Sequence, residues 1–168
     1  LVDYAIELAS AKAVQYAEAR FHIDTGSGVT LTNGVPDPVQ LAKRRGIGIR
    51  ILVDGAMGFA STNDLSRQSL KETVETAYRT AKSSRRLIKK PTRLSEQKAE
   101  TTNWQTESGR SLLDTATEEK FRVLEEIEKN LQPDIVKVDL PSRILILSDY
   151  NTDRYFASTE GARVHGTA

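Results

Sequence analysis

Cysteine is absent from this sequence of 168 residues, and histidine occurs only twice. Without thiols the chain can form neither disulfides nor thiolate metal sites. His22 and His165 lie far apart, and neither has a second nitrogen ligand nearby at a metal-binding spacing. We therefore predict no metal or cofactor residues in this chain. We interpret His22 as a residue on one face of a strand and His165 as exposed.

Long hydrophobic runs and an excess charge of one sign are also missing. No apolar run approaches the roughly 20 residues that cross a bilayer, and no signal-peptide pattern opens the chain. The 24 basic residues nearly cancel the 23 acidic ones, which leaves a net charge of +1. Such a balance gives no overall attraction to nucleic acid or to an anionic membrane. We expect a soluble, cytoplasmic protein that contacts no membrane and does not bind nucleic acid directly.

Motifs for nucleophilic catalysis and phosphate binding do not occur either. No G-x-S-x-G sequence is present. Glycines do gather in residues 46–58, but a phosphate loop needs a glycine-rich turn that leads directly from a strand into a helix. Here the glycines lie within a hairpin pattern, and no G-K-[ST] follows. The sequence therefore predicts no catalytic residues.

Three segments carry apolar residues at the spacing that is typical of one face of a helix. The first covers residues 2–18, and the second begins after Ser66, its predicted N-cap. The third opens with a capping box of Thr115 and Glu118 and ends at Pro133. The predicted buried residues of the second and third helices are Leu70, Val74, Ala77, Tyr78, Ala81, Phe121, Leu124, Ile127 and Leu131.

Between these helices the apolar period falls to two, which is typical of half-buried strands. Asn33-Gly34 and Asp54-Gly55 are strong signals for type I′ hairpin turns. Residues 135–166 predict three or four strands, with turns at Tyr150–Asp153 and Glu160–Gly161. The alternating residues of the strand before Asp54 are Ile47, Ile49, Ile51 and Val53.

Strands that pair in hairpins predict an α+β fold, with antiparallel β-meanders and about three helices. Each half begins with a helix and runs into a meander, so the order is compatible with a weak internal duplication. We expect a single domain over residues 1–168. Residues 83–114 are polar and aperiodic, which predicts a long linker. Trp104 within it would either anchor the linker to the body or contact a partner.

The sequence contains two clusters of charged residues, and the simplest interpretation of each is a solvent-exposed surface. Cations near a helix C-terminus are favoured by the helix dipole alone, although a basic cluster can also hold an acidic partner or nucleic acid. Glutamates of the third helix lie opposite its apolar face. The basic cluster comprises Lys82, Arg85, Arg86, Lys89, Lys90 and Arg93, and the glutamates are Glu118, Glu119, Glu125, Glu126 and Glu128.

The segment GIGIRILVDGAMGFASTNDLS, residues 46–66, resembles the N-terminal signature of the TldD/PmbA proteins, also called modulators of DNA gyrase. Upstream, AEARF leads to a TNG turn about sixteen residues later, as in that family. Downstream, the segments LSRQSLKETVETAYRTAK, TEEKFRVLEEIEK and ASTEG follow in the family's order. The resemblance therefore covers most of the chain.

This resemblance implies a zinc metallopeptidase that acts on unfolded peptides, as a homodimer or with a related subunit. It also implies a zinc site in an H-E-x-x-x-H helix with a later cysteine. Ile23 follows His22 and Gly166 follows His165, so that motif is not in this chain. The catalytic zinc domain is expected beyond residue 168, and no catalytic, cofactor or metal position is carried over.

The expected function is thus that of an N-terminal substrate-shaping and subunit-pairing domain. Exposed strand edges bind extended peptides through main-chain hydrogen bonds, and we predict such edges at Pro36–Pro38 and Arg154–Glu160. Pairing with the catalytic domain or a second subunit is the alternative use of these edges. A different function, a freestanding non-catalytic module that holds an acidic partner through the basic cluster, is the second hypothesis.

The 168-residue chain is expected to bind no zinc stoichiometrically and to cleave no peptide. A tight zinc site needs three or four converging ligands, and two distant histidines do not supply them. Elemental analysis after dialysis tests this expectation. One zinc per chain, lost on His22→Ala, would contradict it.

Overall fold

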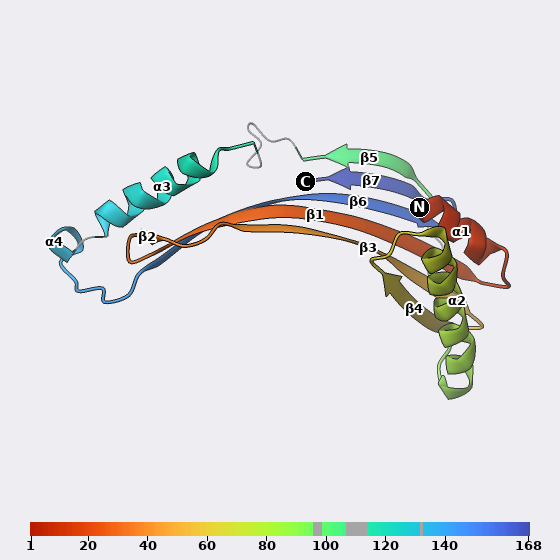
Figure 1. The fold of residues 1–168 in the computed structure, drawn as a ribbon. Coiled ribbons are helices and arrows are strands. Elements are labelled where there is room, and N and C mark those ends of the chain that lie inside the picture. The colour runs from red at the N-terminus through yellow and green to blue at the C-terminus, as the bar shows by residue number, and fades with distance from the viewer. Residues whose placement is uncertain (96–98, 107–113, 132) are drawn as a thin grey trace. The chain divides into compact units, whose positions relative to one another are not determined.

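The computed structural model describes residues 1–95, 99–106, 114–131 and 133–168. They form two compact units. Unit 1 comprises residues 1–23, 44–106 and 152–168, and unit 2 comprises residues 24–43 and 107–151. Helices and a largely antiparallel sheet confirm the α+β class (Figure 1). None of the described helices has the length and hydropathy needed to cross a membrane.

The strands form one seven-stranded sheet rather than separate meanders. Its order is β4-β3-β1-β6-β7-β5, with β2 paired to β1. The helices are α1 (Val2–Ser10), α2 (Arg67–Ser84), the 3₁₀ turn η1 (Arg85–Leu87), α3 (Thr117–Asn130) and the short α4 (Pro133–Val136). The strands are β1 (Tyr16–Thr32), β2 (Val35–Pro36), β3 (Gln40–Val53), β4 (Ala56–Thr62), β5 (Thr101–Gln105), β6 (Ile144–Ser158) and β7 (Arg163–Thr167).

The core of unit 1 lies between α1, α2 and one face of the sheet. The alternating residues of β3 from Ile47 to Val53 are buried there, as predicted. Asp54 and Gly55 both have positive φ, 49° and 78°, which confirms the type I′ turn to β4. Helix α2 lies so close to β4 that a Cβ atom at Gly58 would collide with the backbone of Ala77. Glycine at position 58 is therefore required for this packing.

Helix α2 begins as the sequence predicts. The hydroxyl of Ser66 accepts a hydrogen bond of 3.2 Å from the backbone N–H of Ser69, which satisfies one of the free donors of the first turn. The predicted apolar face of the helix is buried, with Tyr78 only partly so.

Unit 2 packs α3 on parts of β1 and β6. Its small apolar core joins Val29 and Leu31 to Leu124. Beside it, the buried ammonium of Lys120 pairs with Asp149 and donates a 2.8 Å hydrogen bond to Ser27. Removing one partner of such a buried pair lowers the stability of the fold strongly, because the other charge would remain buried without a partner.

Three predictions for α3 are wrong. Ile127 is 43% exposed, whereas Glu128, predicted on the solvated face, is buried against Arg143. The guanidinium group of Arg143 donates two hydrogen bonds to Glu128, of 2.8 and 2.7 Å, which replace water around the carboxylate. The N-cap is Ala116 rather than Thr115.

Element ends also differ from the predictions. The first helix ends at Ser10 instead of continuing to residue 18, and strand β1 begins at Tyr16. Alanines caused this error, because Ala13 and Ala17 continue the helical period, but Ala17 packs on the core face of a strand together with Ala19. Pro133 does not directly end α3; it begins α4.

Part of the predicted linker 83–114 is a strand. Strand β5 pairs in parallel with β7, with Trp104 opposite Gly166. The indole ring occupies the space where a side chain at Gly166 would lie, so Trp104 anchors this segment to the sheet. Residues 96–98 and 107–113 of the predicted linker lie outside the described residues.

The C-terminal region contains two described strands where three or four were predicted. Strand β6 continues through the predicted turn at Tyr150–Asp153, because Thr152 exchanges backbone hydrogen bonds with Ala168. The turn at Glu160–Gly161 is confirmed, with Gly161 at φ 95°. Since β6 lies between β1 and β7, Arg154–Glu160 is not a sheet edge, and that prediction is wrong.

His165 is half-buried rather than exposed. Its ring stacks on Tyr155, with centroids 4.2 Å apart, and its Nε2 atom lies 3.0 Å from a carboxylate oxygen of Asp153. Thr167 donates a second hydrogen bond to the same oxygen. The hydrogen bond from His165 is the main cause of a lowered pKa of Asp153.

Acid is expected to remove the stabilising contribution of Asp153. A carboxyl group whose pKa is lowered on folding contributes fully above its ordinary pKa near ~3.9, and loses this contribution as the pH falls through the lowered value. The difference in free energy of unfolding between the native chain and Asp153→Asn should therefore be larger at about pH 7 than at about pH 2.5. Urea denaturation across this range measures it. A constant difference would show that Asp153 is not held ionised by these contacts.

Helix α3 offers a matched pair of truncations. Leu124→Ala removes a buried side chain and should lower the free energy of unfolding by about 2–5 kcal/mol. Ile127→Ala, one turn further along, changes an exposed side chain and should cost less than about 1 kcal/mol. Urea denaturation followed by circular dichroism compares the two. Equal losses would show that the described face of α3 is incorrect.

Candidate functional site

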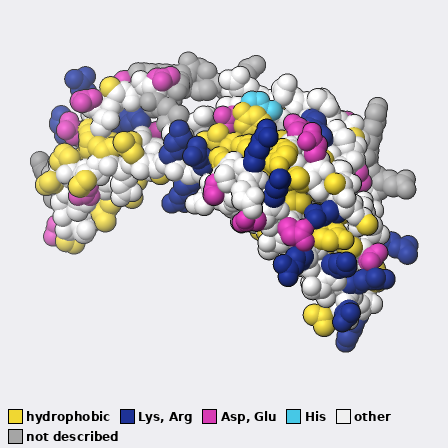
Figure 2. All heavy atoms as spheres, turned by 45° about the vertical axis from the view of Figure 1, so that its right-hand side comes forward, with side chains coloured by type: hydrophobic (Ala, Val, Ile, Leu, Met, Phe, Trp, Pro, Cys, Tyr) yellow, Lys and Arg dark blue, Asp and Glu magenta, His cyan; other side chains and the backbone are white. Residues whose placement is uncertain are grey.

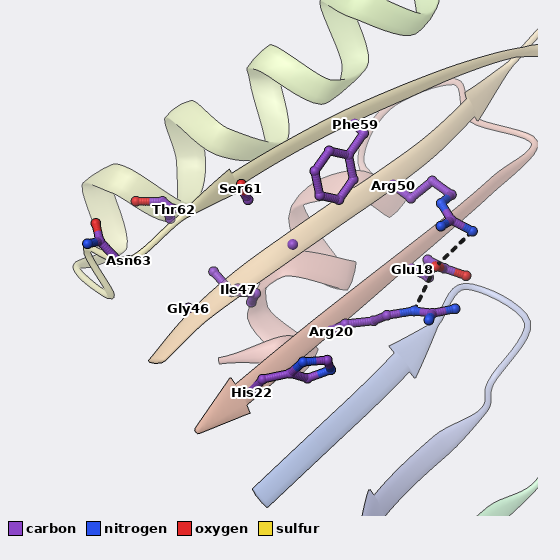
Figure 3. Close-up of a pocket in the computed structure, with 11 residues that line it drawn as sticks. Glu18, Arg20, His22, Gly46, Ile47, Arg50, Phe59, Ser61, Thr62 and Asn63 are labelled. Carbon is purple, nitrogen blue, oxygen red and sulfur yellow. Dashed lines mark hydrogen bonds and ion pairs between the residues drawn. The ribbon is translucent and has the colours of Figure 1, made fainter. Parts of the chain in front are cut away.

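A groove of about 630 Å³ lies on unit 1, on the face of the sheet opposite α2. Strands β1, β3 and β4 supply its walls, and the end of β4 closes one side (Figure 3). We call it the open-face groove. It is lined by Glu18, Arg20, His22, Gly46, Ile47, Gly48, Arg50, Phe59, Ser61, Thr62 and Asn63.

The alternation of the strands explains why these side chains share one face. Successive side chains of a strand point to opposite faces, so burying Ile47, Ile49 and Ile51 turns Gly46, Gly48 and Arg50 to the other side. The two glycines leave room above β3. The ring of Phe59 lies over Gly48, where an added Cβ would approach its edge at 3.1–3.2 Å.

Glu18 organises the polar end of the groove. This residue is only 5% exposed, and its carboxylate accepts hydrogen bonds from the hydroxyl of Tyr16 at 2.7 Å and from Nε of Arg20 at 3.0 Å. Nη1 of Arg50 forms an ion pair with the same carboxylate at 3.3 Å (Figure 3). Burial, and secondarily the hydrogen bond to Glu18, raises the pKa of Tyr16, so the phenol stays a donor over the whole neutral range.

The side chains that line the groove offer charged and uncharged hydrogen-bonding groups beside an apolar ring. Its polar groups are the carboxylate of Glu18, two guanidinium groups, an imidazole and uncharged side chains, and they lie beside one exposed aromatic ring, Phe59. Among the described residues, no group of three or more histidine, cysteine, aspartate or glutamate side chains could hold a metal ion. The residues described here therefore do not form a site that fits zinc.

Sequence reasoning placed His22 on a strand face, and it lines the groove. It missed Glu18, Arg20, Arg50 and Phe59. The available signal was the alternation of charged residues with alanine in YAEARF and of glycine and arginine with isoleucine in GIGIRI. That pattern indicates a polar face for each strand, but not that the two faces adjoin.

The basic cluster gathers around the C-terminal end of α2. Figure 2 shows its lysine and arginine side chains at the lower right. Arg85 forms an ion pair with Asp54 at 3.0 Å, and Lys82 lies over the ring of Tyr78. Lys82 lies in the last turn of α2, where the helix dipole favours a cation.

Comparison with known proteins adds two sequence findings. Residues 17–81 match the family described as PmbA/TldA metallopeptidase domain 1. A metalloprotease of Methanocaldococcus jannaschii is 26% identical over 151 residues, which cover 90% of this chain and 33% of that protein. The chain thus spans about a third of this relative's length.

Solved structures share the fold. A protein from Bacteroides thetaiotaomicron named as a modulator of DNA gyrase gives a TM-score of 0.77 at 17% identity, over 99% of this chain and 38% of that one. TldE from Thermococcus kodakarensis gives 0.66 at 15% identity, over 98% and 36%. The resemblance found in the sequence is confirmed: residues 17–81 match the family model of PmbA/TldA metallopeptidase domain 1, and the curated relative is a metalloprotease.

Proposed function

We propose that this chain is the substrate-shaping and subunit-pairing part of a PmbA/TldD-type metallopeptidase that acts on unfolded peptides. One observation carries the proposal. Every residue that lines the open-face groove lies within 17–81, the segment that matches the family's first domain. The groove is thus built by the segment that matches the family's first domain.

The groove suits an extended peptide. It crosses three strands, is open to solvent, and combines an apolar ring with donors and acceptors of short side chains. A partner that must accept many unfolded sequences gains from such a surface, because main-chain hydrogen bonds and one apolar contact depend little on sequence. The zinc-binding residues and the peptidase reaction are proposed to belong to a region outside residues 1–168.

Subunit pairing is assigned to the outer strands. In the described part of the sheet, β4 and β5 each pair with one neighbour. Their outward N–H and C=O groups can pair with a strand of a second chain, either an identical copy or a related subunit. The Pro36–Pro38 margin, where β2 pairs with β1, is a further candidate.

An unfolded peptide added to the ¹⁵N-labelled chain should shift amide signals of residues 18–22 and 46–63. Phe59→Ala should raise the peptide's Kd at least about tenfold, because an exposed aromatic ring in a groove is a typical anchor of such contacts. Leu87→Ala is the matched control: Leu87 is 83% exposed and outside the groove, so the Kd should not change. Shifts confined to other residues, or none at millimolar peptide in a folded sample, would refute the proposal.

A further inference from the structure

We infer that the open-face groove recognises a carboxylate of its peptide through Arg20 and Arg50, beside an apolar side chain that packs on Phe59. This inference rests on the proposed function, since it names the peptides that the groove holds. Its ligand class is an unfolded peptide in which an acidic side chain, or the C-terminal carboxylate, lies close to an apolar residue.

The charges of the groove carry the first step. Among the described residues that line it, Glu18 is the only acidic one, and it faces two guanidinium groups. One carboxylate against two permanent cations leaves a net positive charge at this end. Glu18 is itself buried, whereas the side chains of Arg20 and Arg50 are 52% and 43% exposed. The uncompensated charge therefore faces solvent.

The remaining hydrogen-bond donors carry the second step. Each guanidinium group has five N–H donors, and the contacts to Glu18 engage Nε of Arg20 and Nη1 of Arg50. Among the described residues, no other acceptor is bonded to these two side chains. A carboxylate can accept two parallel N–H bonds from one guanidinium group or bridge two of them.

Glu18 also prepares the site. By contacting both guanidinium groups it holds them above β1 and β3, and the ring of Phe156, 5.4 Å from the guanidinium carbon of Arg20, restricts that side chain further. Side chains that are ordered before a ligand arrives lose less entropy on binding. The hydroxyl of Tyr16 gives Glu18 a third partner, which keeps its carboxylate satisfied without consuming an arginine donor.

The sheet register carries the third step. Arg50 and Phe59 are direct partners across β3 and β4, and both line the groove. Directly opposed side chains have Cβ atoms roughly 5 Å apart. Side chains two residues apart in an extended peptide lie on one face, about 6.5–7 Å apart. One peptide can therefore place a carboxylate at Arg50 and an apolar group on Phe59 at the same time.

Peptides that differ only in charge test the inference. Four fluorescent peptides share one unstructured sequence around a leucine, with Asp or Asn two residues from it and with a free or an amidated C-terminus. For the native 168-residue chain, we expect the carboxylate form to bind at least about fivefold more tightly than its neutral counterpart, with a preference that shrinks as salt is added. The Asp/Asn pair and the acid/amide pair show which carboxylate is recognised.

Variants then locate the preference. Arg20→Gln and Arg50→Gln should each reduce it to less than about twofold, while binding of the neutral peptide persists. Arg86→Gln, an exposed arginine outside the groove, should leave it unchanged. Circular dichroism establishes whether each variant is folded. If a variant does not fold, the salt dependence of peptide binding to the native chain still tests the inference.

The outcomes separate the two claims. If acidic and neutral peptides bind the native chain equally well, the carboxylate inference is overturned and the proposed function stands. If none of the four peptides binds, the proposed function fails as well. A preference for the carboxylate that persists in both Arg20→Gln and Arg50→Gln would also overturn the inference, because residues other than these two arginines would then bind the carboxylate.

Discussion

The close approach of α2 to β4 at Gly58 is the constraint on which unit 1 depends. Because no side chain separates the strand from the helix backbone near Ala77, the helix can cover β3 and β4 and bury their alternating apolar residues. A strand that buries one face must present the other. The glycines and arginine of β3 are thus turned to the uncovered face, where they form the open-face groove with residues of β1 and β4.

Features encoded by neighbouring residues could be predicted from the sequence. Asp54-Gly55 sets its own turn through two positive φ angles, and Ser66 caps α2 through an atom three residues away. Features that depend on distant partners could not. Strand β5 exists because β7 lies beside it, some sixty residues later, and its own sequence TTNWQ has no apolar alternation. Likewise, Glu128 is buried because Arg143 meets it from outside the helix.

The candidate site follows the same division. The strand-face position of His22 is a property of one strand and was predicted, whereas the cluster of Glu18, Arg20 and Arg50 needs β1 and β3 to be adjacent. Sequence patterns assign faces to strands without assigning neighbours to them. Phe59 shows this limit, because its exposure follows from Gly58 facing the helix, and its role as a groove wall follows from Gly48 on another strand.

The sheet order has a consequence for how the chain is made. Strand β1 lies between β3, which follows it closely in sequence, and β6, which comes more than a hundred residues later. During synthesis the hairpin of β3 and β4 can pack against α2 early. The other edge of β1 stays unpaired until β6 has been synthesised. Over that interval β1 exposes a long row of unpaired N–H and C=O groups, as aggregation-prone edges do. Completing unit 1 depends on its last seventeen residues, 152–168, which supply part of β6 and all of β7.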